Sequence, residues 1–164
     1  MTKTKEYTSQ SIQVLDDIAH IRLRPGLYVG GANATGHFII LKEIIDNAID
    51  EAIAGHASAI RVKISDDGRS AEVFDNGRGI PHEKHPKTGL STLATVFGTA
   101  KSGGKFNNET YGTSVGTHGV GSTATNALSK SFYAESYRGK KVASVSFVRS
   151  EEHTSELQSR ETIS

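Results

Sequence analysis

Residues 43–55 read EIIDNAIDEAIAG, and this stretch decides the fold that the sequence predicts. Its apolar residues recur at intervals of three and four, which is the spacing of one face of an α-helix. Together with the residues before it, the pattern predicts a helix from His37 to Ala54, ended by Gly55. The apolar face of this helix is formed by Leu41, Ile44, Ile45, Ala48 and Ala52.

The opposite face of the predicted helix is polar, and it carries Glu43, Asp46, Asn47 and Asp50. The Glu43 carboxylate can act as a general base that takes a proton from an attacking water. The Asn47 carboxamide oxygen is a hard ligand of the kind that Mg²⁺ prefers. A solvated helix face without any chemistry accounts for the same pattern and stays open as the alternative.

An acidic turn follows a predicted β-hairpin, whose strands at 60–64 and 71–74 flank a turn at 66–69. Residues 75–81 read DNGRGIP, and the two glycines let the backbone turn tightly and approach a ligand. The Asp75 carboxylate, at the end of the strand, can accept a hydrogen bond from an exocyclic amine such as adenine N6. A plain Asn-Gly turn is the alternative.

Glycines gather between Gly98 and Gly121, after a helix predicted at 90–97. A long segment without periodicity inside a compact domain is usually a functional lid or a disordered loop. Residues 116–121 read GTHGVG and lead into a helix that runs from Val120 to Leu128. Free N–H groups at such a helix start form an anion site. The spacing is neither the P-loop nor the Rossmann pattern, so a flexible loop entering a helix is the alternative.

The two ends of this region are simpler. Apolar spacing predicts a first helix from Ser11, which serves as its N-cap, until residues 24–26, Arg-Pro-Gly, end it. Residues 132–148 predict a last hairpin around 138–140. The loop sequence HEKH at 82–85 resembles a metal motif only superficially, because it follows Pro81 outside any helix.

Composition bounds the class of protein. The chain has 164 residues, enough for one domain with a real core. With no cysteine it has no disulfide or thiolate metal site, and a net charge of +1 argues against a strong DNA-binding surface of its own. No apolar run approaches the roughly 20 residues of a membrane span, and the basic N-terminus is not a secretory signal.

The three motifs in this order resemble the GHKL ATPases, and the wider wording resembles the branch of the type II DNA topoisomerase ATPase subunits. RPGLYVG at 24–30, EIIDNAIDEAIAG at 43–55, GGKF at 103–106 and HGVG at 118–121 with NALS at 126–129 are all similar to that branch. The resemblance covers 7–147. It implies an α/β two-layer sandwich of the Bergerat type, with a mixed β-sheet and helices on one face.

The resemblance also implies a site for ATP and Mg²⁺. Glu43 resembles the general base, Asn47 the Mg²⁺ ligand, and Asp75 the adenine-binding carboxylate. Arg78 and Pro81, with Gly79 and Ile80 between them, would line the adenine pocket, and Glu51 would pair with Arg78. Lys105 and Tyr111 resemble lid residues that touch nucleotide, and Tyr7 resembles the arm tyrosine that reaches the partner's nucleotide. The phosphate loop would comprise Gly116, Thr117, His118, Gly119, Val120, Gly121 and Ser122.

The partners implied are DNA, bound through the full-length enzyme, a second copy of the chain on ATP binding, an A-type cleavage subunit, and no membrane. The implied location is the cytoplasm. One position departs from the family: Ile39 stands where a histidine orients the base, and His37 is out of register. The rivals are another GHKL ATPase of the MutL kind, which residues 24–28 argue against, and a nucleotide-binding module without turnover.

Three segments are expected along the chain: an N-terminal arm at 1–10, an incomplete ATP-binding domain at 11–148, and a disordered tail at 149–164. RSEEHTSELQS at 149–159 resembles the in-frame translation of a sequencing adapter, and an ordinary polar tail is the alternative. If the domain stops near Val148, its last strand is an unprotected edge and apolar surface stays uncovered. The 164 residues alone are then expected to be poorly stable and inactive as an ATPase.

Overall fold

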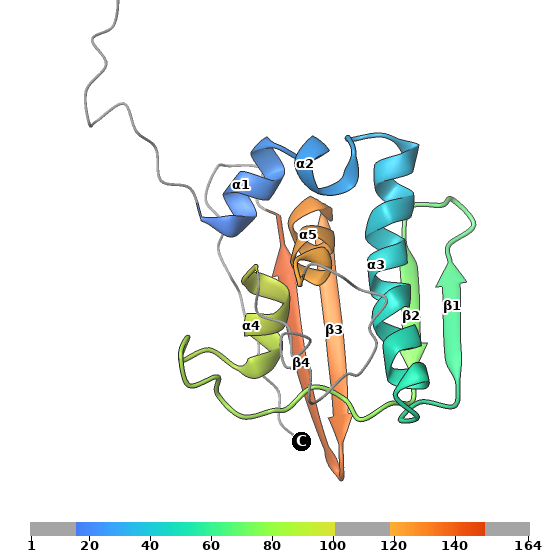
Figure 1. Ribbon diagram of the computed structural model, residues 1–164, viewed down its shortest axis with the longest axis vertical. Coiled ribbons are helices and arrows are strands. Elements are labelled where there is room, and N and C mark those ends of the chain that lie inside the picture. Colours follow the sequence, from blue (N-terminus) through green and yellow to red (C-terminus); the bar gives the residue numbers. More distant parts are fainter. Residues whose placement is uncertain (1–15, 101–118, 150–164) are drawn as a thin grey trace, which may run out of the picture.

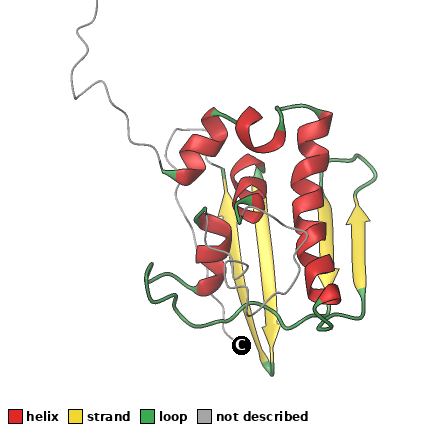
Figure 2. Ribbon diagram, viewed as in Figure 1, coloured by secondary structure: helices red, strands yellow, loops and turns green. Residues whose placement is uncertain are grey.

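The computed structural model describes residues 16–100 and 119–149, in which helices lie across one face of two β-ribbons (Figures 1 and 2). The order of elements in these residues is α1 (Asp17–Leu23), α2 (Gly26–Val29), α3 (Ala34–Ile53), β1 (Ile60–Ile64), β2 (Ala71–Asp75), α4 (Thr92–Gly98), α5 (Gly121–Leu128), β3 (Ser131–Arg138) and β4 (Lys141–Val148). The expected α/β layering is confirmed.

The first two helices differ from the prediction at their ends. α1 begins at Asp17 rather than after Ser11, because the Asp16 side chain accepts a hydrogen bond from the Ala19 N–H at 2.7 Å and caps the helix. It ends at Leu23, before Pro25, as predicted. The segment 26–29 was expected to be a turn, but it forms the four-residue helix α2, because Pro25 has helical backbone angles and can precede a helix.

The long helix α3 begins three residues before the predicted His37. Asn33 has extended backbone angles, and its side chain accepts a hydrogen bond from the Gly36 N–H at 3.1 Å. The polar face of α3 is not a solvated surface, since Asp46 and Asp50 are only 6% and 1% exposed. The solvated-face alternative is therefore wrong for these two side chains.

The strands form two hairpins, as predicted. β1 pairs with β2 antiparallel, with Val62 opposite Val73, and β3 pairs with β4 antiparallel, with Glu135 opposite Ser144. The described strands are not hydrogen-bonded into the single mixed sheet that was expected: they form two separate antiparallel ribbons. The reason is local, since a short turn between two strands produces antiparallel pairing.

The core consists of two clusters that meet at α4 and α5. In the first, Leu93 and Ala94 of α4 pack against Val145 and Phe147 of β4. In the second, Ile21 of α1 packs against Ala124 and Ala127 of α5. α4 starts at Thr92, slightly later than predicted, because the Ser91 side chain caps it. None of the described helices is long and apolar enough to cross a membrane.

Candidate functional site

The Glu43 carboxylate, on α3, lies against the first residue of α5. A Cβ atom placed on Gly121 would be 1.8 Å from Glu43 Oε2 and 2.6 Å from its Cδ. Since real Cβ atoms never come this close, only glycine allows α5 to begin beside this carboxylate. The structure therefore brings together the predicted base and the end of the predicted phosphate loop, which are far apart in the sequence.

Asn47 lies one helical turn beyond Glu43 and contacts the next residue of α5. Its amide Nδ2–H donates a hydrogen bond to Ser122 Oγ at 2.9 Å. Further along α5, the Thr125 hydroxyl donates to the Ile40 carbonyl of α3 at 2.9 Å. The two helices are thus fastened at two levels, and the side-chain positions of the site are fixed by this packing.

The remaining polar side chains of α5 connect it to α4. Thr123, which is 1% exposed, donates to the Thr99 carbonyl at 3.0 Å, and Asn126 donates to the Phe97 carbonyl at 2.9 Å. Sequence reasoning missed this function of α5. The available signal was the density of hydroxyl and amide groups in a short, well-buried helix, which need internal partners.

The acidic turn after β2 is built by its own side chains. Asp75 Oδ1 accepts a hydrogen bond from the Gly77 N–H at 2.9 Å. Asn76 Oδ1 accepts from the Ser58 and Ala59 N–H groups at 2.8 and 2.9 Å. Because these contacts hold the turn against the loop after α3, the half-buried Asp75 carboxylate has a fixed position at the strand end.

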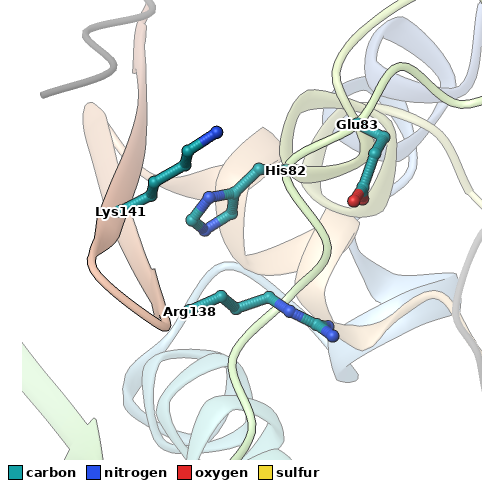
Figure 3. Close-up of a pocket in the computed structure, with 4 residues that line it drawn as sticks. All are labelled: His82, Glu83, Arg138 and Lys141. Atoms are coloured by element: carbon teal, nitrogen blue, oxygen red, sulfur yellow. The ribbon is translucent and has the colours of Figure 1, made fainter.

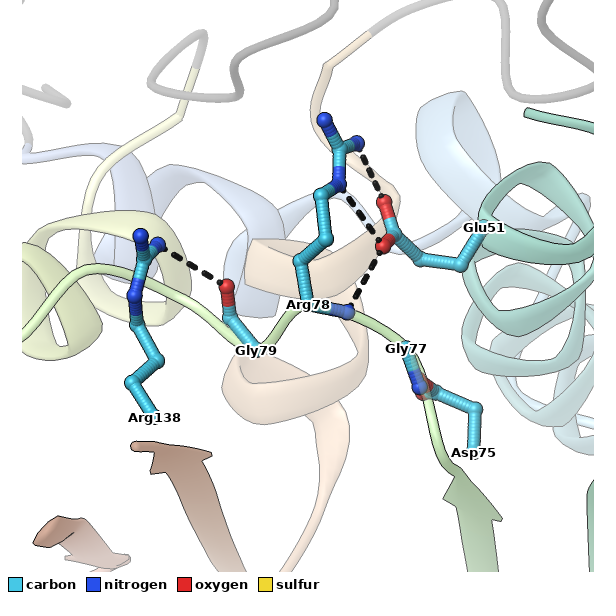
Figure 4. A network of polar contacts seen from close by, with 6 residues as sticks. All are labelled: Glu51, Asp75, Gly77, Arg78, Gly79 and Arg138. Atoms are coloured by element: carbon cyan, nitrogen blue, oxygen red, sulfur yellow. Dashed lines mark hydrogen bonds and ion pairs between the residues drawn. The ribbon is translucent and has the colours of Figure 1, made fainter. Parts of the chain in front are cut away.

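Arg78 is held by Glu51 of α3, as predicted (Figure 4). The guanidinium donates to both carboxylate oxygens, at 2.7 Å from Nη2 and 3.2 Å from Nε, and the Arg78 N–H donates at 3.2 Å. A two-pronged contact of this kind fixes direction as well as distance. It ties the turn at 75–79 to the last turns of α3, close to Asp75.

The next residues of the turn cross the end of β3. Gly79 has a φ of 68°, and a Cβ there would be 2.6 Å from the Tyr137 carbonyl. Arg138 donates to the Gly79 carbonyl at 3.3 Å, and the Ser136 hydroxyl donates to the Ile80 carbonyl at 2.8 Å. Ile80 packs on the first core cluster and Pro81 is exposed, so the two are on different sides of this crossing.

A hollow of about 320 Å³ lies beside this crossing, lined by His82, Glu83, Arg138 and Lys141 (Figure 3). His82 Nε2 is 2.9 Å from the Ser136 carbonyl. Sequence reasoning did not foresee this hollow, because nothing in a hairpin sequence shows which distant loop will lie over it. Among the described residues, no group of three or more His, Cys, Asp or Glu side chains could hold a metal ion.

Two other carboxylates of α3 are in ion pairs. Glu51 pairs with Arg78, and Asp46 accepts from the Lys42 ammonium at 2.5 Å. The hydrogen bond to Asp46 raises the pKa of the exposed Lys42 above its usual range. These contacts give Asp46 and Glu51 structural roles, and Glu43 is the carboxylate of this helix that faces the start of α5.

Several predicted site residues lie outside the described residues: Tyr7, Lys105, Tyr111, Gly116, Thr117 and His118. The end of the predicted phosphate loop is described. Gly119 has a φ of 61°, and Val120 is the N-cap residue of α5 without a side-chain cap of its own. The predicted residues that the structure brings together are therefore Glu43, Asn47, Gly121 and Ser122, with Asp75 and Arg78 at the other end of α3.

Comparison with known proteins agrees with this arrangement. Residues 33–156 match the model of the histidine kinase-, DNA gyrase B- and HSP90-like ATPases. The chain belongs to this ATPase family.

Individual relatives are more specific. The chain is 49% identical over 135 residues to the DNA gyrase B protein of Spiroplasma citri, covering 82% of the chain and 21% of the relative. It is 45% identical over 142 residues to the DNA topoisomerase 4 B protein of Rickettsia prowazekii, covering 86% and 21%. The chain thus spans about a fifth of the length of these relatives.

A solved structure has the same fold. The 43K ATPase domain of Thermus thermophilus gyrase B, in complex with an aminocoumarin, superposes with a TM-score of 0.71 at 32% identity. The match covers 91% of this chain and 35% of that one.

Proposed function

We propose that this chain is the ATP-binding part of the ATPase subunit of a type II DNA topoisomerase, and that it binds and hydrolyses ATP. The observation that carries the proposal is the contact between the Glu43 carboxylate and the first residue of α5. A base and an anion-binding helix start are thereby placed side by side. The relatives of gyrase B and topoisomerase IV B type favour this assignment over a MutL-like ATPase.

The adenine end of the nucleotide belongs at the turn after β2. The half-buried Asp75 carboxylate accepts from the exocyclic amine, and the hydrogen bond from Gly77 keeps that carboxylate in place. Arg78, Gly79, Ile80 and Pro81 form the wall of the pocket. Because Glu51 holds Arg78 at three points, this wall is set before the nucleotide arrives.

The phosphate end belongs at the start of α5. The backbone N–H groups at 119–122 supply donors that favour an anion, and the glycines allow close approach. In the segment before α5, Gly116, Thr117 and His118 would complete the cradle, and Lys105 and Tyr111 would cover it.

The donor set also fits Mg²⁺. Asn47 presents a carboxamide one turn from the Glu43 carboxylate, and Ser122 adds a hydroxyl, so the polar groups are those that this hard cation prefers. Asn47 would hold the ion together with the phosphates, and the ion would neutralise charge on the leaving phosphate oxygens. A site completed by phosphates needs few protein ligands.

In the hydrolytic step, Glu43 accepts the proton of the attacking water as the oxygen of that water bonds to the terminal phosphorus. The bond from phosphorus to the bridging oxygen breaks, and ADP leaves with its electron pair. A positioned carboxylate base of this kind contributes about 10²–10⁴-fold. Ile39 stands in place of a water-orienting histidine, so the orientation of the water rests on other groups.

In the whole protein we propose that ATP joins two copies of the chain, with Tyr7 of each reaching the nucleotide of the other. The same proposal places the protein in the cytoplasm with an A-type cleavage subunit and DNA as partners.

The experiment that tests nucleotide binding is calorimetric titration of the protein with ATP. Asp75→Asn removes a charge-assisted acceptor, and we expect it to weaken binding by about 1.5–3 kcal/mol. Asp67→Asn, in the exposed turn between β1 and β2, is the matched control and should bind normally. Unchanged affinity in Asp75→Asn would reduce Asp75 to a turn residue and remove the adenine pocket from this place.

A further inference from the structure

The Ser122 side chain faces α3 rather than the solvent side of the loop that precedes α5. Its Oγ accepts the hydrogen bond from Asn47 Nδ2 at 2.9 Å. A carboxamide carries its oxygen and its nitrogen on opposite arms, so a nitrogen directed at Ser122 turns Oδ1 away from it. The hydroxyl of Ser122 therefore selects one of the two orientations that the Asn47 amide can adopt about its last torsion.

The relative position of the two side chains is set by the surrounding packing. Thr125, one turn after Ser122, is fastened to the Ile40 carbonyl, and the Glu43 carboxylate packs on Gly121. The start of α5 cannot shift along α3 without breaking one of these contacts. Ser122 is thus held at a constant distance from Asn47, and its hydroxyl is a fixed acceptor rather than a mobile surface group.

We propose that Ser122 is a positioning residue for Mg²⁺ binding: its hydroxyl holds the Asn47 carboxamide with Oδ1 directed toward the metal and the nucleotide phosphates. This inference rests on the proposed function, because it takes Asn47 as the metal ligand. It gives the Ser122 side chain a role separate from its backbone N–H, which belongs to the phosphate cradle. Without the hydroxyl, the amide samples both orientations and presents nitrogen to the metal for part of the time.

The test is calorimetric titration of the protein with ATP, once with Mg²⁺ and once with a chelator. The measured quantity is the Mg²⁺-dependent gain, which is the ratio of the two dissociation constants. Ser122→Ala should reduce this gain about three- to tenfold, the effect of one hydrogen bond, while binding in the chelator stays unchanged. Asn47→Ala should abolish the gain.

A second pair of variants guards against misfolding. Ser122→Thr and Ser122→Val have the same shape and differ only in the hydroxyl, so we expect the Thr variant to keep the gain and the Val variant to lose it. Ser129→Ala, at the other end of α5, removes a hydroxyl that donates to the Thr125 carbonyl at 2.6 Å. It should leave the gain unchanged.

Three results would overturn the inference in distinguishable ways. If Asn47→Ala loses the gain but Ser122→Ala and Ser122→Val keep it, Ser122 does not position the amide and the proposed function stands. If Ser122→Ala weakens binding equally with and without Mg²⁺, its role is structural. If Asn47→Ala keeps the gain, the metal assignment within the proposed function fails, and the inference fails with it.

Discussion

The Glu43 carboxylate occupies the space in which a side chain on Gly121 would begin, since a Cβ there would be 1.8 Å from Glu43 Oε2. Residue 121 is therefore glycine because of a contact with a residue on another helix, not because of its own backbone angles. The contact joins the two halves of the site, and it can be disturbed by a single methyl group.

Gly121→Ala is expected to fold and to lose hydrolysis. The atoms nearest to the added methyl belong to the flexible Glu43 side chain, so this side chain will swing away while the helices stay packed. Displacing the base should lower turnover by about 10² or more. Gly26→Ala, where the added Cβ meets nothing within 4 Å, is the control for steady-state ATPase assays. Normal turnover in Gly121→Ala would show that Glu43 does not act from this position.

Glu51 and Arg78 are expected to be energetically coupled. Their contact is two-pronged but their side chains are 16% and 36% exposed, so solvent screening reduces its strength. A double-mutant cycle with Glu51→Gln and Arg78→Gln, measured by denaturant unfolding, should give about 1 kcal/mol. The Lys42–Asp46 pair, one turn apart on α3, should give only about 0.3–0.5 kcal/mol. Equal coupling in both pairs would contradict the special role of Arg78.

The outer face of β3 predicts a dependence on pH. Tyr133 and Tyr137 both donate their phenol hydrogens to Glu135, which lowers the pKa of that carboxyl and raises the pKa of each phenol. The stabilisation is present above the ordinary pKa of glutamate and is lost as the pH falls through the lowered value. At the alkaline end it is present below the ordinary pKa of tyrosine and is lost as the pH rises through the raised values.

Ultraviolet titration of the phenols measures this directly. In Glu135→Gln, Tyr133 and Tyr137 should ionise at a lower pH than in the unchanged protein. Glu72→Gln, an exposed carboxylate on β2, should leave the titration as it was. If the two curves for Glu135→Gln and the unchanged protein coincide, the two hydrogen bonds do not persist in solution.

Local patterns in the sequence predicted the elements and the motif residues within them. The periodicity around residues 43–55 predicted α3, and alternation with a short turn predicted both hairpins. Such signals are local, because each residue reports only whether its own side chain faces the core. The ends of helices were less well predicted, since α1 and α3 start where the side chains of Asp16 and Asn33 cap them.

Contacts between distant elements could not be predicted in the same way. The position of Ser122 beside Asn47 and the anchoring of Thr123 on α4 depend on how three helices pack, which no spacing rule encodes. The pairing of Glu51 with Arg78 was predicted only through the family resemblance. The hollow between His82 and Arg138 was not predicted at all, because it forms where a loop crosses the end of a hairpin.

The central claim is that this chain hydrolyses ATP with Glu43 as the base, and the most direct test is to measure both ATP affinity and turnover in Glu43→Gln. The substitution keeps the size of the side chain and removes its ability to take a proton. We predict that the affinity stays within about twofold while turnover falls by about 10² or more, with Glu72→Gln as an unaffected control. Turnover that is unchanged in Glu43→Gln would contradict the account.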